Sequence, residues 1–303
     1  MAVKIVTDST SDLPPGVAES LGITIVPAYV HFGNSTYRDG VDISGDEFYR
    51  RLVNGPLHPT TSAPSPGDFA AVYSRLAKES EEIVSVVVTS KLSAVHKSAV
   101  LGREGVRGNC RIEVVDSQSM SMGLGLVAMA AAEKARLGGT IEEVLEAARH
   151  AVPRIRIVAV LESLKYALRG GRLGKASRLL GAMVKVKPMI TQRDGEVIPA
   201  GLARTRAKAV ERLYEFVKKH VPVESVAIVH NTDIKEAEGF AARIKSLIPD
   251  REPVMARVGP ALGVHGGPGA LVVALRKAKE EVDKAVEERR GIRISLPSLR
   301  VSR

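Results

Sequence analysis

Three short runs of β-branched and aliphatic residues in the first half of the chain have the unbroken apolar character of parallel strands that are buried on both faces. These runs are Val3 to Thr7, Ile83 to Thr89 and Ile112 to Val115, and each is followed by a polar cluster rich in serine and threonine. Segments with apolar residues at helical spacing lie between them. The pattern predicts alternating strands and helices.

Two of the expected helices have readable starts. Ser44 to Glu47 fits a capping box, and Ser65 followed by Pro66 opens a run with helical spacing. An open parallel sheet of this kind binds ligands beyond the carboxyl ends of its strands, where the serine and threonine clusters fall. Helix capping explains any one of these hydroxyls, but their concentration at one sheet edge indicates a binding site for an anionic ligand.

The second half of the chain repeats the alternation of strands and helices. A capping box at Thr140 and Glu143 opens a helix that should end before Pro153, where we expect a domain boundary. A length of 303 residues is also enough for two domains. Beyond the boundary, strands are expected at residues 155–161, 186–191, 225–229 and 254–257, and helices at 206–219 and 234–247.

Composition is that of a soluble globular protein, with 45% hydrophobic and 26% charged residues. The single cysteine, Cys110, cannot form an internal disulfide. A strand-like run begins at Val3 and leaves no room for a signal peptide, and the apolar stretch from Leu124 to Ala132 is far shorter than the ~20 residues that span a bilayer. We therefore expect a cytoplasmic protein and interpret that stretch as a core helix.

The formal net charge of +10 is compatible with nucleic acid, an anionic membrane or an acidic partner. Proteins that bind single strands combine basic grooves with stacking aromatic residues, whereas this chain has no Trp, and its 5 Phe and 6 Tyr are not interleaved with basic clusters. We expect no nucleic-acid partner, while transient contact with a membrane stays open.

Nucleotide and metal motifs are incomplete. Gly123, Gly125 and Ala128 match the dinucleotide-binding glycine spacing but start several residues after a strand, so close helix packing explains them better. Gly174 and Lys175 resemble part of a phosphate loop that lacks its other required residues. The sequence has no paired-histidine helix motif, cysteine pair or Gly-x-Ser-x-Gly elbow, and we expect no metal or other cofactor.

Two stretches of the second half stand out. A basic turn from Arg169 to Lys175 precedes an apolar run, and a solvated turn explains it as well as a functional one. A glycine-rich stretch from Gly259 to Ala270 holds one ionisable side chain, His265. Its imidazole can donate a hydrogen bond to a carboxylate, so we interpret the stretch as a ligand loop.

The sequence resembles the DegV family of bacterial fatty-acid-binding proteins from about Val3 to Leu275. The residues that carry this resemblance are Thr7-Asp8-Ser9-Thr10-Ser11-Asp12-Leu13, Thr61-Ser62-Ala63-Pro64-Ser65, Ser90-Lys91-Leu92-Ser93, Leu168-Arg169-Gly170-Gly171-Arg172-Leu173-Gly174, Lys187-Pro188-Met189-Ile190 and His265-Gly266-Gly267-Pro268-Gly269.

The resemblance implies an α/β fold of two domains with a long-chain fatty acid in a tunnel between them. Residues 1–152 should form a three-layer α/β/α domain with a parallel sheet, and residues 153–280 a two-layer α/β domain with a mixed sheet. Residues 281–303 are expected to be a helical extension with a basic tail, which the resemblance does not explain.

The resemblance also implies the site residues. Thr61, Ser90 and His265 match carboxylate ligands, with Ser62 and Ser93 close by, and Gly266 and Gly267 supply backbone to the ligand loop. Arg172 and Arg204 match positions that engage the catalytic subunit in members serving fatty acid kinase. The chain is thus expected to be a non-catalytic carrier that presents the bound carboxylate for conversion to acyl phosphate.

This chain departs from the family pattern at two places near the expected head group. Ala94, Val95 and His96 stand where Gly-Thr-Tyr is usual, and Val264 replaces a common threonine. The alternative hypothesis is a hydrolase or transferase acting on a small anionic substrate in the same crevice, with His265 as general base and Ser90 or Ser93 as nucleophile.

Overall fold

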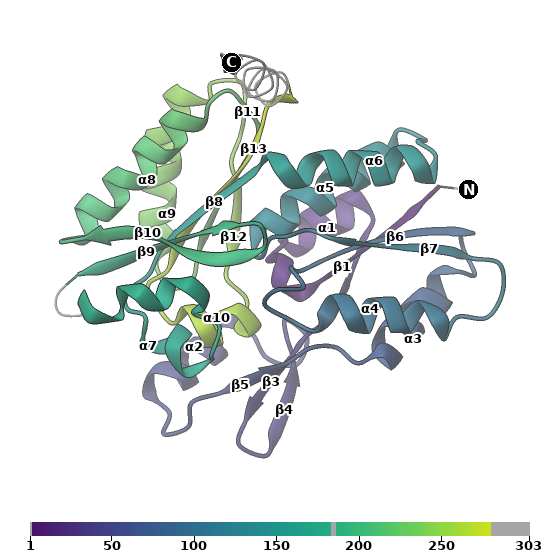
Figure 1. The fold of residues 1–303 in the computed structure, drawn as a ribbon, viewed down its shortest axis with the longest axis horizontal. Helices are drawn as coiled ribbons and strands as arrows, with labels where there is room; N and C mark the ends of the chain where they lie inside the picture. Colours follow the sequence, from purple (N-terminus) through teal and green to yellow (C-terminus); the bar gives the residue numbers. More distant parts are fainter. Residues whose placement is uncertain (1, 183–185, 280–303) are drawn as a thin grey trace, which may run out of the picture.

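The computed structural model describes residues 2–182 and 186–279, and its first half is built on a four-stranded parallel sheet (Figure 1). The sheet has the order β2-β1-β6-β7, and all neighbouring pairs are parallel. Its strands are β1 (Lys4–Asp8), β2 (Ile23–Val26), β6 (Glu82–Val87) and β7 (Arg111–Asp116). The three apolar runs of the first half therefore form β1, β6 and β7, as predicted.

Helices cover both faces of this sheet, which confirms the three-layer arrangement (Figure 1). The pair α3 (Pro66–Leu76) and α4 (Val95–Glu104) packs on one face, and the pair α5 (Met122–Arg136) and α6 (Ile141–Ala151) packs on the other. A further helix, α1 (Pro15–Leu21), lies against β2 and α5.

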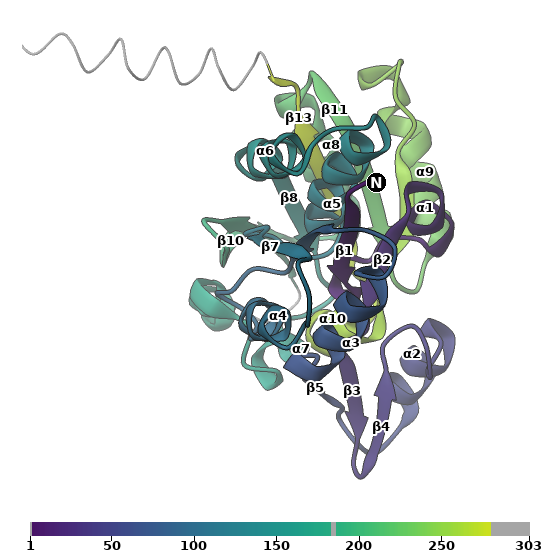
Figure 2. The same ribbon diagram turned by 90° about the vertical axis from the view of Figure 1, so that its right-hand side faces the viewer.

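A small antiparallel sheet with the order β4-β3-β5 was not anticipated from the sequence. It consists of β3 (Tyr29–Phe32), β4 (Ser35–Arg38) and β5 (Thr60–Ser62), and the connection from β4 to β5 contains α2 (Gly45–Asn54). Figure 2 shows this sheet and α2 at the end of the molecule, beyond the carboxyl ends of the parallel strands. It brings Thr61 to the edge where the polar clusters lie.

The second half forms a six-stranded mixed sheet with the order β10-β9-β8-β13-β11-β12, in which only β11 and β12 are parallel. The strands are β8 (Ile155–Val160), β9 (Lys187–Arg193), β10 (Glu196–Ala203), β11 (Val223–His230), β12 (Val254–Arg257) and β13 (Leu271–Lys277). On one face lie α8 (Arg206–His220) and α9 (Ile234–Ile244). This two-layer α/β unit matches the expected fold class.

The opposite face of the mixed sheet packs against α5, which also contacts β1 and β6 of the parallel sheet. A helix placed between two sheets is buried nearly all round, and Leu124, Leu126, Val127 and Ala128 are fully buried. The apolar stretch from Leu124 to Ala132 is thus a core helix, as predicted. In the parts of the chain that the structure describes, no helix is both long and apolar enough to cross a membrane.

Remaining elements join these layers. They are η1 (Ser9–Ser11), η2 (Val152–Arg154), α7 (Lys165–Arg169), η3 (Gly174–Ala182), η4 (Lys245–Leu247) and α10 (Pro260–Gly266). The change from one sheet to the other occurs between α6 and β8, close to the expected boundary at residue 152. The domain limits stay predictions, and the expected extension at 281–303 lies outside the described residues.

The expected helix starts depend on side-chain caps. Complete capping boxes form at Ser65 with Asp68 and at Thr140 with Glu143. The Ser44 hydroxyl accepts from the backbone of Glu47, but the Glu47 carboxylate binds Arg50 and Arg51 instead of returning to the cap, so this box is only half formed.

Candidate functional site

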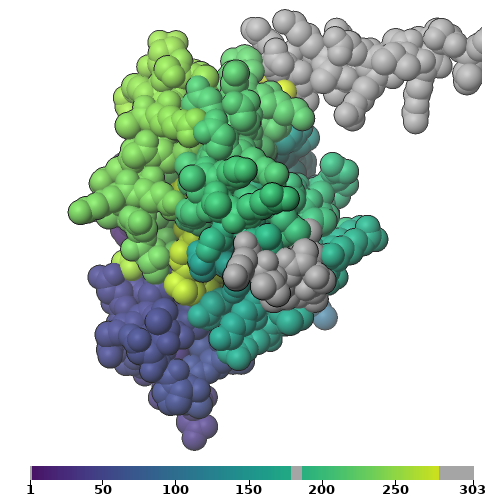
Figure 3. All heavy atoms as spheres, turned by 90° about the vertical axis from the view of Figure 1, so that its left-hand side faces the viewer, coloured from purple at the N-terminus to yellow at the C-terminus, as the bar shows by residue number. Residues whose placement is uncertain are grey.

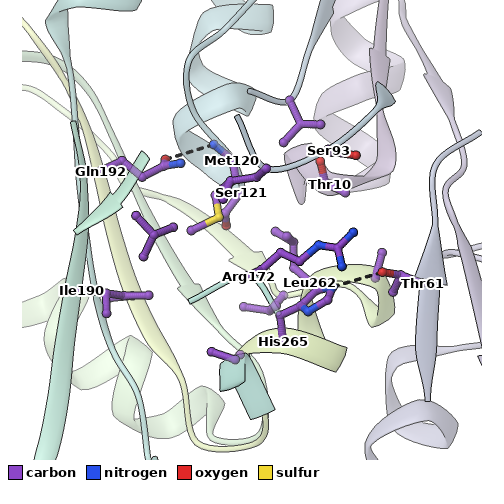
Figure 4. Close-up of a pocket in the computed structure, with 18 of the residues that line it drawn as sticks. Thr10, Thr61, Ser93, Met120, Ser121, Arg172, Ile190, Gln192, Leu262 and His265 are labelled. Carbon is purple, nitrogen blue, oxygen red and sulfur yellow. Dashed lines mark hydrogen bonds between the residues drawn. The ribbon is translucent and has the colours of Figure 1, made fainter. Parts of the chain in front are cut away.

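A cavity of about 210 Å³ lies between the two halves of the chain (Figure 4). It is much larger than the roughly 10–15 Å³ that holds one water molecule. Residues from both halves of the chain line it, and most are apolar. The polar side chains of the lining belong to Thr10, Thr61, Ser62, Ser93, Ser121, Arg172, Thr191, Gln192 and His265.

Thr61 and His265 meet at one end of the cavity although 204 residues separate them. Thr61 Oγ1 and His265 Nε2 are joined by a hydrogen bond of 3.0 Å (Figure 4). β5 carries Thr61, and α10 carries His265. The small sheet and the glycine-rich segment of the second half therefore supply this polar pair together.

The glycine-rich stretch around His265 was expected to be a loop, but residues 260–266 form the short helix α10. Pro260 occupies the first turn, and the buried side chains of Ala261 and Val264 give the helix an apolar face. In Figure 3 the segment of α10, in yellow, lies between the α2 region and the α7 region, and both helices contact it. A glycine run can thus be helical when it packs between two neighbours.

The imidazole of His265 is held in its neutral form. Burial, with a smaller contribution from the nearby charge of Arg172, lowers the pKa of His265 to about 4. His265 Nδ1 is buried and has no hydrogen-bond partner among the described residues. Arg172 lines the cavity while its side chain is largely exposed, and its guanidinium donates to the backbone oxygen of Gly170. A cation therefore stands at the cavity mouth, beside a neutral hydrogen-bonding pair.

Ser62 and Ser93 also line the cavity, as the expected site requires. The Ser93 hydroxyl accepts weakly from the backbone N–H of Val95, at 3.4 Å, at the start of α4. The Ser62 hydroxyl is bonded to the His31 ring at 2.9 Å. Ser93 is therefore better placed than Ser62 to bind a ligand beside Thr61.

Three of the expected site residues lie outside the cavity lining. Ser90 is exposed, and its backbone N–H donates to Asp116, because the turn after β6 directs it toward β7. Gly267 has a φ of +69° and packs against the Tyr166 ring, which would lie 2.1 Å from an added Cβ. Gly266 does line the cavity. Arg204 is exposed after β10 and does not line it.

Buried carboxylates position the polar cluster after β1. Asp8 accepts hydrogen bonds from the backbone and hydroxyl of Thr10 and from the backbone N–H of Val88. Burial raises the pKa of Asp8, and these hydrogen bonds oppose the shift. Asp8 thus fixes Thr10 in the cavity wall and ties the end of β1 to the end of β6.

Asp12 makes a second link, between the two halves of the chain. It accepts from Ser121 Oγ at 2.5 Å and from the backbone N–H of Gly259 at 2.8 Å. Burial raises the pKa of Asp12 well above its ordinary value, and the nearby Asp39 adds to the shift. Ser121 precedes α5 and Gly259 precedes α10, so one carboxylate joins β1, α5 and the helix of His265.

Ser121 adopts a left-handed φ of 50°, which is strained for a residue with a Cβ. Its backbone N–H donates to Thr10 O at 2.8 Å, and its hydroxyl donates to Asp12. These two hydrogen bonds hold the strained turn at the entrance to α5.

Sequence reasoning missed Thr10, Ser121 and Gln192 as cavity residues. Thr10 and Ser121 lie in or beside the hydroxyl clusters, and this position at the sheet edge was the available signal. Gln192 follows Ile190 by two residues, and both line the cavity from β9. Alternation alone does not distinguish an inward-facing glutamine from the polar start of a hairpin.

The arrangement that a hydrolase requires is not assembled in the described residues. His265 has hydrogen-bond contact with Thr61, and none with Ser90, Ser93 or a carboxylate. Residues 2–182 and 186–279 contain no group of three or more His, Cys, Asp or Glu side chains that could hold a metal ion.

Fold and site together define an α/β protein with a largely apolar cavity between a parallel-sheet unit and a mixed-sheet unit, and a hydrogen-bonded threonine and histidine lie at one end of this cavity. The sequence profile described as "Uncharacterised protein, DegV family" matches residues 2–278. The chain belongs to the DegV family. A DegV domain-containing protein of Caldanaerobacter subterraneus is 34% identical over 274 residues, covering 89% of this chain and 97% of that protein.

Solved structures of other bacterial proteins share the fold. A DegV family protein from Thermus thermophilus, described as fatty acid binding, is 31% identical with a TM-score of 0.83, covering 92% of this chain and 100% of that one. A stearic-acid-binding protein from Eubacterium ventriosum is 28% identical with a TM-score of 0.85, covering 92% of this chain and 99% of that one.

Proposed function

We propose that the protein binds one long-chain fatty acid in the cavity, with the carboxylate at the Thr61 and His265 end. The observation that carries this proposal is a largely apolar cavity with a hydrogen-bonded threonine and histidine at one end. The proteins from Thermus thermophilus and Eubacterium ventriosum, which share the fold, are described as binding a fatty acid.

The energetics agree with an acyl ligand. Burying ~14 methylenes at about 0.8 kcal/mol each gives roughly 11 kcal/mol before entropic and desolvation costs. Each hydrogen bond to the carboxylate adds about 1.5–3 kcal/mol. The acyl chain of the ligand therefore supplies most of the affinity, while Thr61, Ser93 and His265 fix the orientation of its carboxylate. The positive charge of Arg172 favours an anion at the mouth of the cavity.

Mass spectrometry of an organic extract from the purified protein tests this proposal. We expect one fatty acid per chain, of roughly C14 to C20 by the same methylene arithmetic. A protein that carries no fatty acid after purification, and takes up none when incubated with palmitic, oleic or stearic acid, would contradict it.

We further propose that the bound carboxylate is presented to the catalytic subunit of a fatty acid kinase, which converts it to acyl phosphate. Phosphoryl transfer depends on positioning and charge stabilisation, so a carrier with a fixed carboxylate suits a separate kinase. Arg204 is exposed and lies away from the cavity lining, as a docking residue should. Arg172 lines the cavity and would serve both ligand and partner.

Reconstitution with a bacterial fatty acid kinase subunit and ATP tests the partner. Arg204→Ala should reduce acyl phosphate formation and leave the fatty acid content unchanged. Arg149→Ala, on the exposed face of α6, is the matched control and should behave like wild type. Equal acyl phosphate formation by wild type and Arg204→Ala would overturn the docking role of Arg204. No product with wild type would overturn the kinase partnership, whatever the fatty acid content.

A further inference from the structure

The side-chain amide of Gln192 has a fixed orientation in the cavity wall. Gln192 Oε1 accepts from the backbone N–H of Met120 at 3.2 Å (Figure 4) and from Ser119 Oγ at 3.1 Å. A backbone N–H can only donate, so the oxygen must face Met120 and the NH₂ group must face the other way. Gln192 Nε2 is buried and has no hydrogen-bond partner among the described residues.

The register of the mixed sheet locates this amide along the cavity. Leu161, Ala159 and Ile157 line the cavity from one face of β8 and the residue after it, and Leu161 lies nearest the His265 end because it precedes α7. Thr191 pairs with Val158, so Gln192 lies at the level of Ile157. Four residues of strand span about 13 Å.

Gln192 is therefore well down the cavity from the pair that holds the head group. Figure 4 shows it across the cavity from Thr61. The cavity lining near it includes the apolar side chains of Ile157, Ile190 and Val197, the last of which pairs with Gln192 across β9 and β10. An unbranched saturated chain would leave the Nε2 donor buried without a partner, at a cost of roughly 1–3 kcal/mol.

We propose that the distal part of the cavity is a subsite for an oxygen substituent on the acyl chain, with Gln192 Nε2 as its hydrogen-bond donor. The inference rests on the proposed fatty acid function and names the ligand class: oxygenated long-chain fatty acids. A ketone fits best, because it needs only a donor. A hydroxyl can also accept from Nε2, but it must in addition find an acceptor for its own hydrogen.

Competitive displacement of a fluorescent fatty acid tests the subsite, using stearic acid and a series of oxo-octadecanoic acids in which the ketone moves along the chain. We expect one position, or two neighbouring ones, in the distal half to bind about 5- to 10-fold more tightly than stearic acid. The affinity of the corresponding hydroxy acid should lie between those of the preferred oxo acid and stearic acid. In Gln192→Met, which keeps the length and lacks the donor, this maximum should disappear, so that the variant binds no oxo acid more tightly than it binds stearic acid.

The infrared band of an isotope-labelled ketone gives a second readout. In wild type the carbonyl band should shift to lower frequency at the preferred position, and in Gln192→Met it should return toward the value of a non-bonded ketone. An affinity profile that is flat in wild type, or a maximum that persists in Gln192→Met, overturns the subsite and leaves fatty acid binding intact. Failure of wild type to bind stearic acid or any oxo acid overturns both proposals.

Discussion

The hydroxyl of Thr61 and the imidazole of His265 are joined at 3.0 Å, and they come from β5 of the small antiparallel sheet and from α10 near the other end of the chain. Neither element belongs to the parallel sheet whose carboxyl edge they face. The polar end of the cavity therefore exists only when both halves of the chain are folded and packed together.

Thr61→Val should weaken fatty acid binding by roughly 10- to 100-fold, because valine keeps the shape of threonine and removes a hydrogen bond to a charged group. Displacement of a fluorescent fatty acid measures the change. Thr60→Val is the matched control, since Thr60 precedes Thr61 on β5, is exposed and does not line the cavity. Equal loss of affinity in both variants would contradict a direct role for the Thr61 hydroxyl.

The depressed pKa of His265 predicts a pH dependence of stability. The pKa of His265 is about 4 in the folded chain, whereas the ordinary value for histidine is 6.5. Between pH 4 and pH 6.5 the unfolded chain therefore binds more protons than the folded chain. His265 should therefore cost stability progressively as the pH falls from about 6.5 toward 4, by about 2 kcal/mol after allowance for partial exposure. Above pH 7 this cost vanishes.

Urea unfolding of ligand-free protein between pH 4 and 7 measures this dependence. Asp39, whose pKa burial raises to about 6, opposes it by favouring the folded state at low pH, so the comparison must be between variants. His265→Gln should lose less stability than wild type as the pH falls. If the free energy of unfolding changed with pH in the same way in His265→Gln and wild type, the lowered pKa of His265 would be refuted.

Ala159→Phe should shift the ligand preference toward shorter chains. Ala159 lines the cavity from β8, between its sheet neighbours Ile190 of β9 and Val272 of β13. A phenyl ring at this position would occupy the path of the acyl chain. Stearic acid should lose at least about tenfold in affinity, whereas decanoic acid should lose little. Equal losses of affinity for both acids would indicate that the acyl chain of the ligand does not pass Ala159.

The local rules that fix strands and helices were readable from the sequence. Unbroken apolar runs gave β1, β6 and β7, and Thr140 with Glu143 capped α6 as the spacing indicated. The small sheet could not be predicted, because β4 is mostly exposed and β5 has only three residues, so neither strand shows an alternation of apolar and polar residues. Such strands are specified by their neighbours and not by their own side chains.

The candidate site was predictable by motif but not in its internal geometry. Thr61, Ser93 and His265 line one cavity, whereas Ser90 lies outside its lining and its backbone N–H donates to Asp116. The position of a residue in a turn depends on which partners its backbone groups find, and here the partner lies at the end of β7, a strand that is distant in the sequence. Gln192 was missed for a related reason, since its partner Met120 lies on another element.

Asp12→Ala should reduce both stability and fatty acid affinity, and Asp12→Asn should be much milder. Alanine leaves Ser121 Oγ and the Gly259 N–H without an acceptor, at roughly 1–3 kcal/mol for each group, and frees the start of the helix that carries His265. Burial disfavours the charged form of Asp12 and raises its pKa well above the ordinary value, so removing the charge should cost little, and asparagine retains an oxygen for Gly259. Urea unfolding and fatty acid displacement, measured on both variants, separate the contribution of the Asp12 charge from that of its hydrogen bonds. If Asp12→Ala unfolds at the same urea concentration as Asp12→Asn, then this carboxylate does not hold the two halves together.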